Sequence, residues 1–79
     1  MQLNKAVSIR PRDLLDEREM TQYKLFTSTG VSKGTVSNIL SCRHKALNLR
    51  ILHEICQGLG ISLYDFFDSP LFDNENLDP

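Results

Sequence analysis

Apolar side chains recur at intervals of three and four residues in five successive segments of the chain, and no alternating apolar–polar run exceeds a few residues. The first pattern is typical of helices that bury one face, whereas alternation would indicate strands. We therefore predict an all-α fold in which five short helices share one core. The predicted helices cover residues 7–18, 22–29 and 33–40, a fourth segment after Asn48 and a short fifth segment after Ser62.

Residues that typically cap helices separate these segments. The expected N-caps, whose side chains can accept a hydrogen bond from a free backbone N–H, are Thr21, Ser32, Asn48 and Ser62. Asp65 follows Ser62 by three residues, a spacing typical of a capping box. Gly60 is expected to end the fourth helix, and Gly30 to supply a positive φ in the turn after the second. Pro11 is expected in the opening turn of the first helix, where its missing N–H costs least.

Charge is distributed unevenly along these segments. The chain carries nine Lys and Arg against ten Asp and Glu, a net charge of −1, and such a balance is unusual for a nucleic-acid-binding protein. Residues 65–79, however, hold five acids and no Lys or Arg, whereas residues 1–64 hold nine basic and five acidic side chains, a net charge of +4. Residues 24–50 contain five basic side chains and no acid. This basic stretch is the part of the chain expected to face an anion.

Length and composition exclude several classes of protein. A chain of 79 residues is expected to form one domain, too small to enclose a two-substrate active site. No apolar run approaches the ~18 residues that span a bilayer, and the N-terminus lacks the apolar segment of a secretory signal. Two cysteines are too few for a disulfide-stapled domain. A cytoplasmic location without membrane binding is therefore expected.

The second and third predicted helices are joined by only three residues, Gly30, Val31 and Ser32. Two short helices with so tight a connection are typical of the helix-turn-helix unit, whose second helix enters the major groove of DNA while the first crosses the backbone. Val36 and Ile39 would pack the second helix against the first. The outward residues of the second helix are short or basic, which lets them approach base edges.

This pattern resembles the Cro/repressor-type (xenobiotic-response-element) helix-turn-helix family, over roughly residues 7–68. The motifs that carry the resemblance are Thr21-Gln22-x-x-Leu25-x4-Gly30-Val31-Ser32-x3-Val36-Ser37-x-Ile39 and Leu52-x2-Ile55-Cys56-x2-Leu59-Gly60-Ile61-Ser62-Leu63-x2-Phe66-Phe67. The resemblance implies a compact five-helix bundle of the phage-repressor DNA-binding-domain type. Residues 1–6 would form an N-terminal arm and residues 69–79 a frayed acidic tail, with Leu71 and Phe72 able to dock on the core.

The resemblance also implies a DNA interface on this chain. Base contacts would come from the exposed face of the predicted recognition helix, at Lys33, Gly34, Ser37 and Asn38. Contacts with the DNA backbone would flank that helix, at Thr21, Gln22, Ser32, Thr35, Ser41, Arg43, His44, Lys45 and Asn48. Lys33 is suited to guanine O6 and N7, and Asn38 to adenine. The basic stretch, identified from charge alone, covers the same part of the chain.

Three residues depart from the pattern of the family. Phe26 stands where the family favours Ala or Gly, because the two helices of the unit pass closest there, so its ring must widen the crossing or rotate away. Gly34 lies inside the recognition helix, at a cost of up to ~1 kcal/mol relative to Ala; either the backbone closely approaches DNA, or a glycine in a first turn is simply cheap. Cys42 replaces a usual Gly in the turn after the recognition helix.

Metal binding and catalysis have little support in the sequence. The residues Cys42, His44, His53 and Cys56 have a composition compatible with zinc, but their spacing fits no common zinc module. No catalytic triad, Gly-rich phosphate loop or small-molecule site is indicated, and the acids near Asp16 are expected to pair with Arg12 and Arg18 on a solvated face. We therefore expect neither a cofactor nor an enzyme.

Two functions remain for the chain. The first is a sequence-specific, double-stranded-DNA-binding transcriptional regulator, in keeping with a repressor of bacterial or phage origin, as the resemblance implies. The second is a protein-interaction module on the same fold, in which the acidic, aromatic segment after residue 63 binds a partner. That segment could also form a homodimer, and its candidate surface residues are Phe67, Leu71 and Phe72.

Overall fold

Side-chain hydrogen bonds determine where four of the helices begin. The hydroxyl or amide oxygens of Thr21, Ser32, Asn48 and Ser62 each accept a bond from the backbone N–H three residues later. The computed structural model describes residues 1–79, with α1 (Leu3–Glu17), α2 (Gln22–Thr27), α3 (Lys33–Leu40), α4 (Leu49–Leu59), α5 (Leu63–Phe67) and two 3-10 turns, η1 (Pro70–Phe72) and η2 (Asn74–Asn76). The prediction of an all-α fold with five helices is confirmed.

α1 begins earlier than the sequence indicates. It starts at Leu3 rather than at residue 7, so residues 3–6 are helical and do not form an extended arm. The N-cap residue, Gln2, makes no side-chain capping bond, and the sequence therefore carries no local signal for this start. Pro11 consequently lies inside the helix, where it is buried, and its expected place in the opening turn is wrong.

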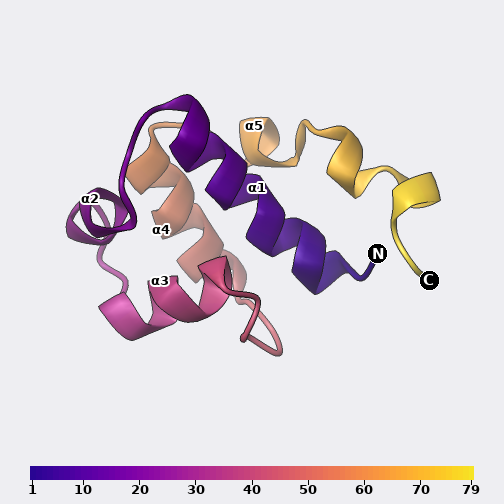
Figure 1. Ribbon diagram of the computed structural model, residues 1–79, viewed down its shortest axis with the longest axis horizontal. Helices are drawn as coiled ribbons and strands as arrows, with labels where there is room; N and C mark the ends of the chain where they lie inside the picture. The colour runs from indigo at the N-terminus through magenta and orange to yellow at the C-terminus, as the bar shows by residue number, and fades with distance from the viewer.

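The apolar faces of all five helices meet in one core. α1 crosses the middle of the molecule, with α3 on one side and the C-terminal turns on the other (Figure 1). The core residues are Val7, Leu14, Leu15, Leu25, Val31, Val36, Ile39, Leu40, Leu52, Ile55, Cys56, Leu59 and Phe66. No helix combines the length and hydropathy that a membrane span requires.

Gly58 in α4 packs tightly against side chains of α2 and of the turn that follows it. A Cβ atom on this residue would lie 2.6 Å from the methyl carbon of Thr29 and 3.1 Å from Cδ1 of Leu25. A methyl group at this position would overlap the Thr29 side chain and crowd that of Leu25, so both would have to move. Phe26, by contrast, is only half-buried, and its ring rotates outward toward Tyr23, with 6.2 Å between the ring centroids.

The turn between α2 and α3 does not use a left-handed glycine. Gly60 is the one glycine with a positive φ, at 74°, so the conformation expected of Gly30 is wrong. The Thr29 hydroxyl instead accepts a hydrogen bond from the N–H of Val31 at 3.2 Å, and this side chain closes the turn. α2 ends at Thr27 rather than at residue 29 for the same reason: Thr29 belongs to the turn.

Two polar side chains of α1 tie it to the helices on either side. The hydroxyl of Ser8, a fully buried residue, donates to the carbonyl oxygen of Ile39 in α3 at 2.6 Å. The Arg10 guanidinium donates to the carbonyl oxygens of Phe66 at 2.8 Å and Asp65 at 2.7 Å, which satisfies the open end of α5. α1 therefore fixes α3 and α5 relative to each other.

The C-terminal residues are ordered in the structure, whereas the sequence predicts a frayed tail. Phe72 packs against the core, as anticipated, and Leu71 is half-buried beside it. The side-chain amide of Asn76 donates to the carbonyl oxygen of Pro70 at 2.6 Å. The ammonium group of Met1 lies 3.1 Å from Oδ1 of Asp78, the single ion pair of the structure. These contacts order the segment as two short turns against α1.

Candidate nucleic-acid interface

α3 presents two chemically different faces. Val36, Ile39 and Leu40 are buried against the other helices, whereas Lys33 and Asn38 are exposed on the opposite side. Ser37 is half-buried at the edge of this outer face, and Gly34 lies on it. The helix is therefore held rigidly by its apolar side and projects a short, polar surface, as the sequence indicates.

The surface around Gly34 is open. A Cβ atom built on this residue would have no neighbour within 4 Å, and its φ is not in the left-handed region. The fold itself therefore does not require glycine here, in contrast to the packed site at Gly58. Any requirement for glycine at this position must come from a molecule that approaches α3 from outside.

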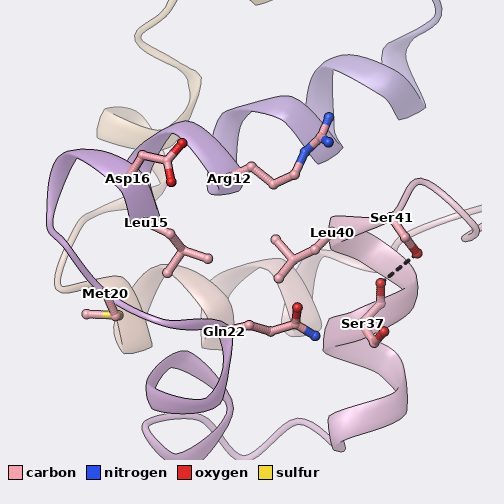
Figure 2. A pocket seen from close by; sticks show the side chains of 8 residues that line it. All are labelled: Arg12, Leu15, Asp16, Met20, Gln22, Ser37, Leu40 and Ser41. Atoms are coloured by element: carbon pink, nitrogen blue, oxygen red, sulfur yellow. Dashed lines mark hydrogen bonds between the residues drawn. The ribbon is translucent and has the colours of Figure 1, made fainter.

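A shallow polar pocket of about 470 Å³ lies where the start of α2 meets the end of α3 (Figure 2). Gln22, Ser37 and Ser41, three of the predicted DNA-contacting residues, line it together. Figure 2 shows the Gln22 side chain extending toward Ser37, and Ser41 donates its hydroxyl to the carbonyl oxygen of Ser37 at 2.7 Å. The remaining lining residues, on α1, on α3 and in the α1–α2 loop, are Arg12, Leu15, Asp16, Met20 and Leu40.

The prediction that Arg12 pairs with a nearby carboxylate on a solvated face of α1 is wrong. No carboxylate lies within ion-pair distance of Arg12 or Arg18, because the Met1–Asp78 pair is the only one in the structure. Arg12 instead donates its Nε–H to the carbonyl oxygen of Ser8 at 3.3 Å and reaches the polar pocket. Only the three-dimensional packing of α1 beside α3 brings it there, so no local motif could have identified it.

The basic stretch likewise has no ionic partner within the fold. None of its cations, Lys24, Lys33, Arg43, Lys45 and Arg50, pairs with a carboxylate, and all of them are exposed. Their positive charge is therefore not neutralised internally and is presented to solvent. This arrangement can attract a polyanion to α2, α3, the following loop and the start of α4.

The loop after α3 is fixed by its backbone. Cys42 adopts a left-handed conformation with φ of 60°. This allows the N–H of Arg43 to bond the carbonyl oxygen of Asn38 at 2.8 Å. The Arg43 guanidinium then lies 3.4 Å from the Ser37 hydroxyl oxygen, and Asn4 of α1 donates to the carbonyl oxygen of Lys45 at 2.9 Å. The loop is thereby held beside the outer face of α3.

Several predicted backbone-contacting residues also serve as helix caps. Asn48 accepts from the N–H of Ile51 through Oδ1, at 2.8 Å, which leaves its amide N–H groups free to donate. Ser32 donates its hydroxyl to Thr35 Oγ1 at 2.9 Å, so the Thr35 hydroxyl keeps its own proton for an external acceptor. Thr21 caps α2 beside Gln22. These groups present hydrogen-bond donors around the ends of α2, α3 and α4.

His44 differs from the other predicted backbone-contacting residues. Both of its ring nitrogens are shielded from solvent, and neither has a hydrogen-bond partner. A ring in this position has no nitrogen at the surface with which to contact a phosphate oxygen. The structure therefore places His44 within the packing of the loop.

The two cysteines lie in different environments. Cys56 is fully buried in α4, and desolvation by burial raises the pKa of its thiol to about 11. Cys42 is exposed at the end of α3. At no point do three or more His, Cys, Asp or Glu side chains come together in a geometry that could hold a metal ion.

The conformation of Cys42 leads to a prediction for stability. A non-glycine residue in the left-handed region costs roughly 1–2 kcal/mol, and glycine removes that cost while adding some entropy to the unfolded chain. Cys42→Gly is therefore expected to raise the free energy of unfolding by about 1 kcal/mol, measured by urea denaturation. Cys42→Ser keeps a side chain at the same φ and is expected to have no such effect. Equal stabilisation by both variants would contradict the explanation.

Comparison with known proteins identifies the domain. Residues 12–70, well over half of the chain, match the family model of the Cro/C1-type helix-turn-helix DNA-binding domain. The crystal structure of the prophage Lp1 protein 11 superposes with a TM-score of 0.79 at 28% sequence identity, over 94% of this chain and 99% of that chain. Comparison with curated protein sequences gives no significant match.

Proposed function

Because the chain belongs to the Cro/C1-type helix-turn-helix DNA-binding family, we propose that it is a transcriptional repressor that reads the major groove of double-stranded DNA with α3. The observation that carries the proposal is the outer side of the helix-turn-helix unit. There the exposed polar face of α3, which carries Lys33, is followed by the exposed loop cations Arg43 and Lys45, and none of the three has a carboxylate partner. A surface of this kind suits a helix inserted between two phosphate backbones.

Base recognition is assigned to the outer face of α3. Lys33 can donate to guanine O6 and N7, and the Asn38 amide can pair bidentately with adenine. Ser37 contributes a hydroxyl at the edge of that face, and Gly34 allows the helix backbone to come close to the bases. This assignment is supported by the exposure of Lys33, Gly34 and Asn38 on the side of α3 that faces away from the core.

Backbone contacts are assigned to donors on both sides of α3. Gln22 and Ser41 share a pocket, and Arg12, which reaches the same pocket, would add a positive charge to a phosphate held there. Asp16 also lines this pocket and would oppose the anion. The loop cations Arg43 and Lys45 follow Ser41, and the Arg43 guanidinium lies 3.4 Å from the Ser37 hydroxyl oxygen. The capping residues Thr21, Ser32, Thr35 and Asn48 complete the set with hydroxyl and amide donors.

Loss of a base-reading side chain should change sequence preference. Asn38→Ala and Lys33→Ala are each expected to weaken the free energy of binding to the preferred duplex by about 1–3 kcal/mol. Each is also expected to relax the sequence preference at one base pair. A binding selection on randomised duplexes with the wild-type protein would first define that duplex. Each variant would then be measured on it and on its single-base mutants, and an unchanged preference in both variants would exclude α3 as the reading element.

Loss of a phosphate contact should act differently. Arg43→Ala is expected to weaken binding to all duplexes alike and to lower the slope of log affinity against log salt by about 0.9. Arg18→Ala is the matched control, because Arg18 is an equally exposed arginine outside the assigned interface. If the two variants changed the salt slope by the same amount, the loop would not contact the DNA backbone.

The second function, a protein-interaction module, makes a different prediction for duplex binding. It predicts no affinity for any duplex in low salt, whereas the proposed repressor binds random duplexes weakly and its preferred sequence tightly. An electrophoretic shift series therefore separates the two functions. The full chain should be used, since Phe72 packs against the core and removal of residues 69–79 would disturb the fold.

A further inference from the structure

α5 carries an apolar surface that is partly open to solvent, although one of its residues, Leu63, also packs against the core. Leu63 lies one helical turn before Phe67, and Tyr64 lies one turn before Asp68. Together these four residues line a hollow of about 400 Å³, and we call them the α5 face. Tyr64 is 78% exposed and Phe67 40% exposed, whereas Phe66 between them is fully buried. Aromatic side chains left at the surface in this way are typical of binding sites.

The α5 face rests on a rigid support. The Phe67 ring packs edge-on against Phe66 and Phe72, with centroid distances of 5.1 Å and 4.9 Å. The Arg10 guanidinium holds the carbonyl oxygens at the end of α5, and the Ser62–Asp65 capping box holds its start. Phe67 is therefore presented in one orientation, and little conformational entropy would be lost when a partner covers the surface.

Negative charge lies beside this apolar surface. Asp68 belongs to the α5 face, and Asp73 follows Phe72, whose ring packs against Phe67 with 4.9 Å between the ring centroids. Neither carboxylate has an ionic partner, because the single ion pair joins Met1 to Asp78. The Arg10 guanidinium bonds the carbonyl oxygens of Phe66, Asp65 and Asp68, the last at 3.5 Å, and no carboxylate. The surface therefore offers aromatic anchors beside two carboxylates without an ionic partner, Asp68 and Asp73, which we call the acidic rim.

We propose that the α5 face docks a positively charged, amphipathic segment of another protein, with apolar side chains covering Tyr64 and Phe67 and with Lys or Arg side chains meeting the acidic rim. Charge complementarity argues against a second copy of this chain, since a two-fold arrangement would place Asp68 and the acidic turns of both copies against one another. α5 lies across α1 from α3 (Figure 1), so a partner docked on α5 would leave the proposed DNA-binding side of α3 free.

The test uses the full chain and three synthetic peptides of equal length. The first arranges leucines along one helical face and lysines elsewhere, the second contains the same residues in shuffled order, and the third replaces the lysines of the first with glutamate. The first peptide is expected to bind at least tenfold more tightly than the second, and the third not to bind. Amide shifts in an NMR titration should move in α5 and the acidic turns but not in α3.

Variants locate the binding to this surface. Tyr64→Ser is expected to lower the affinity for the first peptide about tenfold. The double variant Asp68→Asn with Asp73→Asn is expected to make that affinity less dependent on salt concentration. Tyr23→Ser is the matched control, because Tyr23 is an exposed tyrosine on α2 and lies outside the α5 face, and it should leave peptide affinity unchanged. Duplex affinity should be unaffected by Tyr64→Ser, so DNA binding and docking are tested separately.

Three results would overturn the proposal. Equal binding of the amphipathic and shuffled peptides would show that only the net charge acts and that the aromatic surface has no part. Absence of binding to every peptide would exclude a cationic partner. Sedimentation of the protein as a dimer that dissociates on Tyr64→Ser would show that a second copy covers the α5 face instead.

Discussion

Gly34→Glu is expected to reduce duplex affinity by about 100-fold or more without unfolding the protein. A Cβ atom at residue 34 meets nothing within 4 Å, so the fold has room for the new side chain, and glutamate favours a helix more than glycine does. On DNA, the same side chain would be forced against the bases and phosphates, where like charges cost several kcal/mol. Duplex affinity by fluorescence anisotropy and melting temperature by circular dichroism test the two halves of this expectation.

The matched control is Gln57→Glu, which adds the same charge at an exposed position of α4. It is expected to lower duplex affinity only slightly, through net charge. A third variant, Gly34→Ala, distinguishes close backbone approach from a merely tolerated glycine, because alanine adds one methyl group and no charge. If Gly34→Glu and Gln57→Glu reduced affinity equally, α3 would not be the element that enters the groove.

Phe66→Ala is expected to destabilise the fold by about 3–5 kcal/mol. Phe66 is fully buried and touches both neighbouring aromatic rings, and its carbonyl oxygen receives the Arg10 bond. A chain of this size has a free energy of unfolding of roughly 4–12 kcal/mol, so the variant would lose a large fraction of its stability. Urea unfolding monitored by circular dichroism measures the change.

Tyr64→Ala, on the same helix, is the control for this prediction. Tyr64 is an aromatic residue two positions away, but 78% of it is exposed, and its removal is expected to change the unfolding free energy by about 0.5 kcal/mol or less. A similar loss in both variants would mean that the stability of α5 depends on helix propensity and not on the burial of one ring.

The features that the sequence predicts correctly are local ones. The N-caps at Thr21, Ser32, Asn48 and Ser62 each depend on a residue and a backbone group three positions away, so they can be recognised without knowledge of the fold. Cys42 stands where the family pattern has Gly, and its φ of 60° lies in the region that favours glycine.

The features that the sequence misses depend on residues distant in the chain. Ser8 bonds Ile39 across 31 positions and Arg10 bonds Phe66 across 56, and no spacing rule relates such pairs. Gly58 is required only because Thr29 and Leu25 lie against it. Arg12 reaches the polar pocket only because α1 packs beside α3. Periodicity also misses the start of α1 at Leu3, since Gln2 provides no cap.

The two bonds made by α1 have a consequence for how the protein unfolds. Ser8 and Arg10 lie two residues apart, and on a helix this spacing points their side chains to nearly opposite sides. One side holds the end of α3 and the other the end of α5. Neither surface can detach without breaking contacts to the same helix, so the chain should unfold cooperatively as one unit. A stabilising ligand on either side would therefore protect the amide hydrogens of both from exchange with solvent.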